Sequence, residues 1–405
     1  MSTISVTIEK EEPPHIGSKT GQLDGLRVAI VHHWFVSMAG GERVVNAIAA
    51  MFPQADIFTL VLDKRKLPPE LRDRKITASF LDRTLIARRA HRHFLPFYPL
   101  AVEMLDVSGY DLVLTSDSGP MKGVVTDLGS THICYCHSPM RYLWDAHAAY
   151  LREMSPLVRT FFGLASHYVR NWDYSAAQRV DHFLANSNYV AGRIHKYYRR
   201  ESTVIHPPIT TSRGFLAKQP EDYYLAVGRL VPYKRTDILI DACELLGRKL
   251  VIIGDGPELK TLQKRAGQNV RFIGEVDEQT LSNCYAHCRA LLFAADEDFG
   301  MVPLEAQSHG RPVIAYGKGG SLETVAGVCP PIDIDGDTPL NGITGMFFQE
   351  QTPASLAQTI LNFEAIERRF VPEQIQAHAR EFDESVFVER LGKFIERAIS
   401  NQGNG

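Results

Sequence analysis

Short apolar runs alternate with segments of helical periodicity through the second half of the chain. The runs read as strands and the segments between them as helices, in the order 223–227, 236–246, 249–253, 258–265, 270–273, 279–287, 290–295 and, after a further short helix, 313–316. Strands that alternate with helices indicate a parallel sheet with both faces covered. The pattern therefore predicts the α/β fold class.

The first half repeats this alternation less regularly. Runs that read as strands occur at 27–31, 55–60, 111–115, 132–136, 183–187 and 204–208. Because 405 residues exceed what one hydrophobic core normally serves, we expect two domains. The predicted organisation is a disordered polar tail over 1–24, a first domain over 25–210, a polar linker, a second domain over 222–378, and a C-terminal helix over 379–405 that can return to the first domain.

Overall composition narrows the class of partner. The net charge of −3 argues against a general nucleic-acid binder, and no apolar run reaches the length of a membrane span. The N-terminal tail lacks the apolar core of a signal peptide. None of the six cysteines stands in a Cys-x2-Cys pair, so buried thiols in a reducing cytoplasm are expected rather than a metal site.

The stretch from 295 to 320 carries the strongest chemical signal. It places Glu297 on a loop after a strand and Glu305 in the first turns of a short helix. The amides of Phe299, Gly300 and Met301 approach the positive end of that helix, which attracts anions and polar oxygens. Two acceptor carboxylates there suit a polyol held by its hydroxyls, whereas either glutamate alone would fit an ordinary acidic surface loop.

Cations are expected at the same edge of the second sheet. Arg229 follows the first strand of this half, and Lys234 stands five positions later. A guanidinium and an ammonium would neutralise a diphosphate as it leaves, and surface salt bridges are the alternative. Gly274 ends a neighbouring strand, where backbone groups can pair with the edge of a base.

Two features of the first half point toward the same ligand. Gly40 and Gly41 follow a strand and open a helix, which brings backbone N–H groups to a phosphate but also fits a simple tight turn. His137 stands just beyond the carboxyl end of a strand, where open α/β sheets bind their ligands, although a lone histidine is more often structural.

A basic segment over 64–92 precedes an apolar and aromatic run over 94–100. A solvated surface is one interpretation of this segment. The other is peripheral attachment to an anionic membrane, because each basic side chain near such a surface contributes about 1 kcal/mol and aromatic rings can enter the interface.

Taken together, these motifs resemble the donor-site signature of retaining glycosyltransferases of family 4, which have two Rossmann-like domains facing a cleft (the GT-B fold). The resemblance covers most of the chain and rests on Gly40-Gly41, His137, Asn186-Ser187, Gly228-Arg229, Lys234, Gly274, the Glu297…Glu305 pair and Gly319-Gly320. One departure is Arg235, where a glycine often follows the lysine in this family.

For the second half, the resemblance implies that Glu305 binds the ribose hydroxyls. Glu297 and the amides of residues 299–301 would hold the donor sugar, and Arg229 and Lys234 would hold the diphosphate. For the first half, it implies that His137 lies beside the reacting sugar and that Gly40-Gly41 lets this domain close on the phosphates.

The first half is also similar to a mannosyltransferase-like subgroup that builds bacterial O-antigens and exopolysaccharides. We therefore expect a hexosyltransferase that uses GDP-mannose, with UDP-glucose as the alternative donor, and a polyprenyl-diphosphate-linked glycan as acceptor. The resemblance implies no metal and no other cofactor, since the nucleotide sugar is a substrate. The expected location is the cytoplasm, on the inner face of the cell membrane.

Two rival classes remain open at this point. One is a non-catalytic nucleotide-sugar-binding subunit. This class is disfavoured because all five polar residues of the predicted site are present together: His137, Arg229, Lys234, Glu297 and Glu305. The other is a sugar-nucleotide oxidoreductase or epimerase. Such an enzyme would need a dinucleotide-binding fingerprint with three glycines, and Leu259 stands where the third glycine would be. For the enzyme, no obvious carboxylate nucleophile stands near His137, so we expect same-face substitution.

Overall fold

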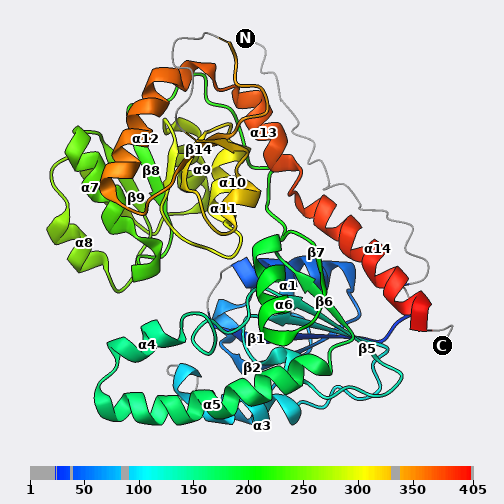
Figure 1. Ribbon diagram of the computed structural model, residues 1–405. Coiled ribbons are helices and arrows are strands. Elements are labelled where there is room, and N and C mark those ends of the chain that lie inside the picture. The colour runs from blue at the N-terminus through cyan, green and yellow to red at the C-terminus, as the bar shows by residue number, and fades with distance from the viewer. Residues whose placement is uncertain (1–22, 24, 37–39, 84–90, 330–337, 403–405) are drawn as a thin grey trace, which may run out of the picture.

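The computed structural model describes residues 23, 25–36, 40–83, 91–329 and 338–402. Within these residues the chain forms two seven-stranded sheets whose strands pair in parallel, each sheet within its own domain (Figure 1). The predicted α/β fold class is confirmed. The predicted disordered tail lies outside the described residues except for Leu23, which is buried in the first core.

The first sheet has the strand order β3-β2-β1-β4-β5-β6-β7. Its strands are β1 (Val28–Phe35), β2 (Asp56–Leu62), β3 (Ile76–Ala78), β4 (Leu112–Asp117), β5 (Thr131–Cys136), β6 (His182–Ala185) and β7 (Ser202–Val204). Helices α1 (Gly40–Met51), α3 (Tyr98–Glu103), α4 (His147–Glu153), α5 (Pro156–Gln178) and α6 (Asn188–Tyr198) belong to this domain. Strands β1, β4 and β5 carry core residues of both faces, which is why they read as continuous apolar runs.

The second sheet has the strand order β10-β9-β8-β11-β12-β14-β13. Its strands are β8 (Tyr224–Val227), β9 (Leu250–Ile253), β10 (Val270–Gly274), β11 (Leu291–Phe293), β12 (Val313–Tyr316), β13 (Gly327–Val328) and β14 (Gly345–Phe348). The helices are α7 (Thr236–Leu246), α8 (Leu259–Arg265), α9 (Glu278–His287), α10 (Met301–Ser308), α11 (Ser321–Thr324), α12 (Pro353–Ile366) and α13 (Pro372–Arg380).

The last helix, α14 (Glu384–Gln402), leaves the second domain and packs on the first (Figure 1). Its apolar side chains Phe387, Leu391 and Ile395 lie in the same core cluster as strands β1, β2 and β5. This packing ties the end of the chain to the domain in which the chain begins.

Several predicted element boundaries are wrong. The strand expected at 204–208 ends at Val204, because only the Ile205 amide still bonds to the Ala185 carbonyl before Pro207 and Pro208 remove the next donors. The basic segment was not expected to contribute to the sheet, yet it contains edge strand β3. Helix α13 and strands β13 and β14 were also missed, since they are short and lie between glycines, prolines and polar residues.

Both sheets reverse the direction of their strand order near the middle, and the second sheet does so again at its edge pair β14-β13. The central reversal falls between β1 and β4 in the first sheet and between β8 and β11 in the second. Ligands of open α/β sheets bind beyond the carboxyl ends of the strands at such reversals, because the adjoining loops diverge and leave room. Gly40-Gly41, Arg229 and Glu297 all follow these strands.

Candidate functional site

Lys234 and Glu297 meet beyond β8 and β11. The Lys234 ammonium forms an ion pair with the Glu297 carboxylate, and both side chains are mostly buried. Burial lowers the pKa of Lys234 to about 8, although the negative charge of the Glu305 carboxylate acts in the opposite direction. Lys234 and Arg229 line the same pocket, and Arg229 itself is exposed at its edge.

The backbone after Lys234 explains why glycine is common at the next position of the family pattern. Arg235 has a φ of 53°, in the left-handed region that a residue with a Cβ rarely adopts. Its guanidinium bonds both Asp237 oxygens, at 3.0 and 3.1 Å, which helps to hold this conformation. The departure therefore keeps the turn that presents Lys234.

Glu305 lies in the second turn of α10 and is already bonded on both oxygens. Its Oε1 accepts from Arg43 Nη1 at 2.6 Å, and its Oε2 accepts from Tyr285 Oη at 2.8 Å. Arg43 belongs to α1 of the first domain, so this ion pair bridges the two domains. Sequence reasoning missed Arg43, although it stands directly behind the Gly40-Gly41 pair.

The loop that carries Glu297 and the 299–301 amides is held by Gly320. A Cβ on Gly320 would lie 2.2 Å from the Phe299 Cα, so no larger residue fits at this position. The Gly320 amide also donates to the Glu297 carbonyl at 2.8 Å. Through this close backbone packing, Gly320 of the trailing glycine pair shapes the loop that is predicted to bind the donor sugar.

Gly274 ends β10 with open space around it. No atom lies within 4 Å of a Cβ placed there. The opening is at the carboxyl edge of the second sheet, as predicted for a base-binding position, and no neighbouring side chain fills it.

His137 lies at the head of a buried row of polar groups. Its Nε2 is 2.8 Å from Ser116 Oγ, which is itself 3.1 Å from His32 Nδ1. Burial, with a smaller contribution from His32, lowers the pKa of His137 to about 3, so the ring is neutral at physiological pH. His32 and Ser116 were not predicted, because they come from two other strands of the sheet.

Gly40 and Gly41 bring α1 close to both halves of the site. A Cβ on Gly40 would lie 2.8 Å from Met301 Sδ in the second domain, and one on Gly41 would lie 3.7 Å from His137 Nε2. The N-termini of α1 and α10 therefore lie close together, with Arg43 and Glu305 paired beside them. The predicted residues of the two domains thus come together around one site.

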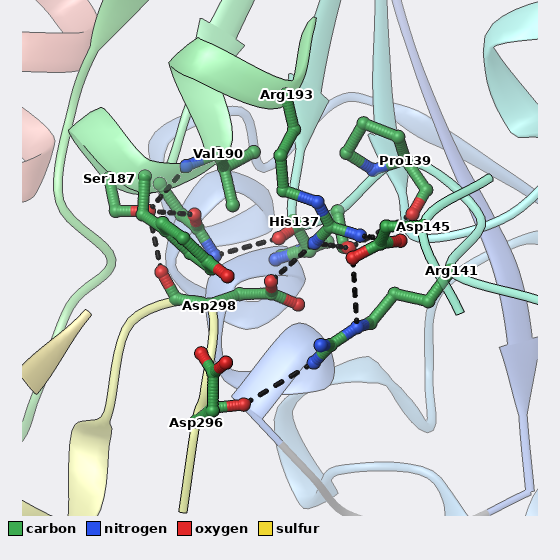
Figure 2. A network of polar contacts seen from close by, with 12 residues as sticks. His137, Pro139, Arg141, Asp145, Ser187, Val190, Arg193, Asp296 and Asp298 are labelled. Carbon is green, nitrogen blue, oxygen red and sulfur yellow. Dashed lines mark hydrogen bonds and ion pairs between the residues drawn. The ribbon is translucent and has the colours of Figure 1, made fainter. Parts of the chain in front are cut away.

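A second group of polar contacts joins the domains beside this site. Figure 2 shows Arg193, Asp145 and Ser187 of the first domain with Asp296 and Asp298 of the second, around His137. The interdomain ion pair of this group, between Arg193 and Asp298, was not expected from the sequence, since its partners lie 105 positions apart.

No metal cluster is found in the described part of the chain, where no group of three or more His, Cys, Asp or Glu side chains could hold an ion. The six cysteines are free thiols, and Cys134, Cys136, Cys243 and Cys288 are buried. The predicted independence of metal remains a prediction.

Some side chains of the basic segment form hydrogen bonds and ion pairs within the first domain. Arg74 donates to the carbonyls of Ala49, Phe52 and Ala55, and Arg65 and Lys75 pair with nearby aspartates. Residues 84–90 of the segment lie outside the described residues.

The architecture is that of the GT-B glycosyltransferases. The crystal structure of Anabaena Alr3699/HepE in complex with UDP superposes with a TM-score of 0.67 at 16% identity, covering 92% of this chain and 100% of that one. This identity is too low to transfer more than the fold.

Family models identify both domains. The model "Glycosyltransferase Family 4" matches residues 38–213, and the model "Glycosyl transferases group 1" matches residues 208–379. The chain therefore belongs to the family 4 glycosyltransferases with a group 1 second domain.

Two curated relatives match parts of the chain. A D-inositol 3-phosphate glycosyltransferase of Jonesia denitrificans is 31% identical over 180 residues, which cover 35% of this chain and 42% of the relative. A GDP-mannose-dependent alpha-(1-6)-phosphatidylinositol monomannoside mannosyltransferase of Mycobacterium tuberculosis is 40% identical over 119 residues, 25% of this chain and 31% of the relative. The chain thus spans less than half the length of either relative.

Proposed function

We propose that the protein is a retaining hexosyltransferase that moves a hexose from a nucleoside diphosphate sugar to a hydroxyl of a polyprenyl-diphosphate-linked glycan in bacterial polysaccharide synthesis, without a metal. The observation that carries this proposal is the set of Glu297, Glu305 and Lys234 at one sheet edge. The start of α1 in the other domain lies close both to Met301 at this edge and to His137. Carboxylates accept from sugar and ribose hydroxyls, and cations neutralise phosphate.

Two ion pairs of the site fit this role. Lys234 pairs with Glu297, and Arg43 pairs with Glu305. In the complex, the diphosphate of the donor would replace Glu297 as the partner of the Lys234 ammonium. The hydroxyls of the donor would replace the two cations as partners of the Glu297 and Glu305 carboxylates. The pairs keep the buried charges matched until the donor arrives.

GDP-mannose is the favoured donor and UDP-glucose the alternative. The mycobacterial relative is named as GDP-mannose-dependent, whereas the Anabaena protein has been crystallised with UDP-glucose. The open space around Gly274 is compatible with a purine or a pyrimidine bound by backbone groups.

Same-face substitution is the favoured mechanism. The acceptor oxygen forms its bond to the anomeric carbon on the face that the phosphate leaves, and the departing phosphate oxygen takes the hydroxyl proton. Arg229 and Lys234 stabilise the negative charge on that phosphate. Asp298, which lies near His137, is engaged by Arg193, and burial raises its pKa, so it is poorly placed to act as a nucleophile. Trapping of a covalent glycosyl-enzyme would overturn this mechanism.

An anionic membrane is the proposed partner surface, and α5 supports it better than the basic segment does. Leu157, Phe161, Leu164 and Tyr168 follow one another at helical spacing, and Leu157 is 84% and Phe161 70% exposed. Leu100 of α3 is also exposed, and Trp172 of α5 donates to Glu103 of that helix. Arg159 of α5 is exposed, and the single acid of α5, Asp173, is buried, so the charge of this helix surface suits anionic lipid. No described helix is long and apolar enough to cross a membrane.

Flotation with vesicles tests the membrane surface. Phe161→Ser with Leu164→Ser should abolish binding to vesicles of anionic phospholipid, whereas Leu245→Ser, an equally exposed leucine of the second domain, should not. Equal flotation of all three proteins, or a dimer that the double substitution dissociates, would reject the lipid surface.

Donor hydrolysis tests the proposed activity. Purified protein would be incubated without acceptor with GDP-mannose, UDP-glucose, UDP-galactose or UDP-GlcNAc, beside Glu305→Ala. Turnover of one donor that the substitution abolishes would establish the class and name the donor. Donor-dependent thermal stabilisation without turnover, in the presence of membrane extract as acceptor, would favour a binding-only subunit.

A further inference from the structure

Helix α6 of the first domain contacts the sugar-binding loop of the second domain through Arg193. Its Nη1 donates to Ser138 Oγ at 2.8 Å and to Asp298 Oδ1 at 2.5 Å, and its Nη2 donates to Asp145 Oδ1 at 2.6 Å. The Arg193 side chain is only 8% exposed. Ser138 adjoins His137, and Asp298 adjoins Glu297, so one guanidinium holds the backbone neighbours of a predicted residue from each domain (Figure 2).

The charges around Arg193 show why a cation at this position stabilises the contact between the domains. Asp145 and Asp298 face the same guanidinium from different domains. Without the cation, two carboxylates would approach each other at a largely buried position, which disfavours the contact between the domains. Arg193 thus replaces the repulsion between Asp145 and Asp298 by an ion pair with each of them.

The N-terminus of α6 makes a second contact with the other domain. Glu323 of α11 accepts from the Asn188 and Tyr189 amides at 2.8 and 3.0 Å, and His206 Nε2 lies 3.2 Å from it. Burial raises the pKa of Glu323, but the bonds from His206 and from these amides outweigh it, so the net pKa is lowered. A carboxylate at a helix N-terminus is stabilised by amides that have no acceptor within the helix.

The same end of α6 also reaches the sugar-binding loop through its cap. Ser187 Oγ accepts from the Val190 amide at 3.1 Å and donates to the Asp298 carbonyl at 2.5 Å. Asn186, one position earlier, donates to the His137 carbonyl at 2.9 Å. The strand-to-helix turn before α6 therefore bonds both to the His137 loop and to the 296–300 loop.

We propose that α6 is the clasp that sets the closed geometry of the site, with Arg193 and Glu323 as positioning residues that hold the sugar-binding loop against the His137 loop. The proposal rests on the proposed function for its catalytic consequence. Arg229, Lys234, Gly274 and Glu305, the residues assigned to the nucleotide, all lie in the second domain outside the clasp. The clasp should therefore govern turnover and leave nucleotide affinity alone.

Hydrogen exchange tests the clasp without any need for activity. The Asn188 and Tyr189 amides should exchange slowly in the ligand-free protein and at least about tenfold faster in Glu323→Ala, because first-turn amides have no acceptor in their own helix. Fast exchange of both amides in the wild-type protein would overturn the proposal.

Kinetics with matched binding measurements tests the positioning role. Arg193→Gln should lower kcat for donor hydrolysis at least about tenfold and change the Kd for GDP or UDP by less than about twofold. Arg193→Lys should recover part of the loss, since an ammonium keeps the charge but reaches fewer acceptors. The control is Arg289→Gln, which removes a comparable partly buried Arg–Glu pair within the second domain and should leave kcat unchanged.

The outcomes separate the two proposals. An unchanged kcat in Arg193→Gln, or a parallel loss of nucleotide affinity, would reject the positioning role. If the wild-type protein turned over no donor, the proposed function would fail, and the exchange of the α6 amides would still decide whether the clasp exists.

Discussion

The two domains build their halves of the site in different ways. In the second domain, Glu297, the 299–301 amides and Glu305 come from one loop and the helix that follows it, and Arg229 and Lys234 come from one turn. In the first domain, His32, Ser116 and His137 come from strands β1 and β4 and the end of β5, and they meet only because these strands are neighbours in the sheet. Site residues that come from a local motif can be predicted from the sequence, whereas site residues that strand order brings together cannot.

The halves also differ in their electrostatics. In the second domain, Lys234 pairs with Glu297, and Glu305 pairs with Arg43 of the first domain, so the charged groups of this half already have partners that a charged ligand can replace. His137 is neutral, with its pKa lowered to about 3 mainly by burial, and its ring is held by the Ser116 hydroxyl. Under the proposed function, this difference predicts a division of labour in which the second domain would bind the charged nucleotide and the first domain would orient the sugar that reacts.

The largest effect on donor hydrolysis is expected for the loss of the Lys234 ammonium. Lys234→Ala should lower kcat by about 100- to 1000-fold, because the leaving diphosphate loses a buried charge that stabilises it in the transition state. Steady-state donor hydrolysis would measure it, with Lys249→Ala, an exposed lysine paired to Asp222, as the control. A change confined to KM would assign Lys234 to ground-state binding instead.

The next effect concerns the ribose carboxylate. Glu305→Ala should weaken GDP or UDP binding about 100-fold, the cost of two hydrogen bonds to a charged acceptor. Calorimetric titration would measure it, beside Arg43→Ala. Because Arg43 competes for the same carboxylate, the latter variant should bind nucleotide no more weakly than the wild type. Weaker binding by Arg43→Ala would show that this arginine contacts the nucleotide itself.

A smaller effect is expected in the first domain. Ser116→Ala should lower kcat about tenfold while the nucleotide Kd stays constant, because the His137 ring loses a partner that fixes its orientation. Thermal unfolding would show whether the fold is kept. A fall in nucleotide affinity would contradict the division of labour between the halves.

The smallest effect is a pH dependence that belongs to the second domain alone. The active form of Lys234 is the ammonium, and with a pKa lowered to about 8 it loses its proton as the pH rises. The plot of kcat/KM against pH should therefore fall on the alkaline side, from about pH 8 upward. Lys234→Arg should remove this limb, since a guanidinium stays charged. His137 should add no acidic limb near pH 6.5, because it is already neutral there. An alkaline limb that persists in Lys234→Arg would assign the titration to another group.

Particular elements show how far the sequence could be interpreted. The α7 and β12 boundaries were predicted to the residue, because helical periodicity and Gly247 define α7 and because Pro312 and Gly317 flank β12. Strand β1 was cut short at Val31 because His32 and His33 look polar, although both are buried as the strand continues to Phe35. The short pairing strands β3, β13 and β14 have no periodicity of their own and depend on a neighbour for definition.

The sequence by itself determined the α/β class and predicted the residues proposed for the donor half, since hydrophobic period and motif spacing are local properties of the chain. The tertiary structure decided which distant groups meet: Arg43 with Glu305, Ser116 with His137, and Arg193 and Glu323 across the domain boundary. The physical reason is that strand order and domain packing arise from the burial of apolar surface over the whole chain. Spacing along the sequence carries no record of which polar groups that burial brings within hydrogen-bond distance.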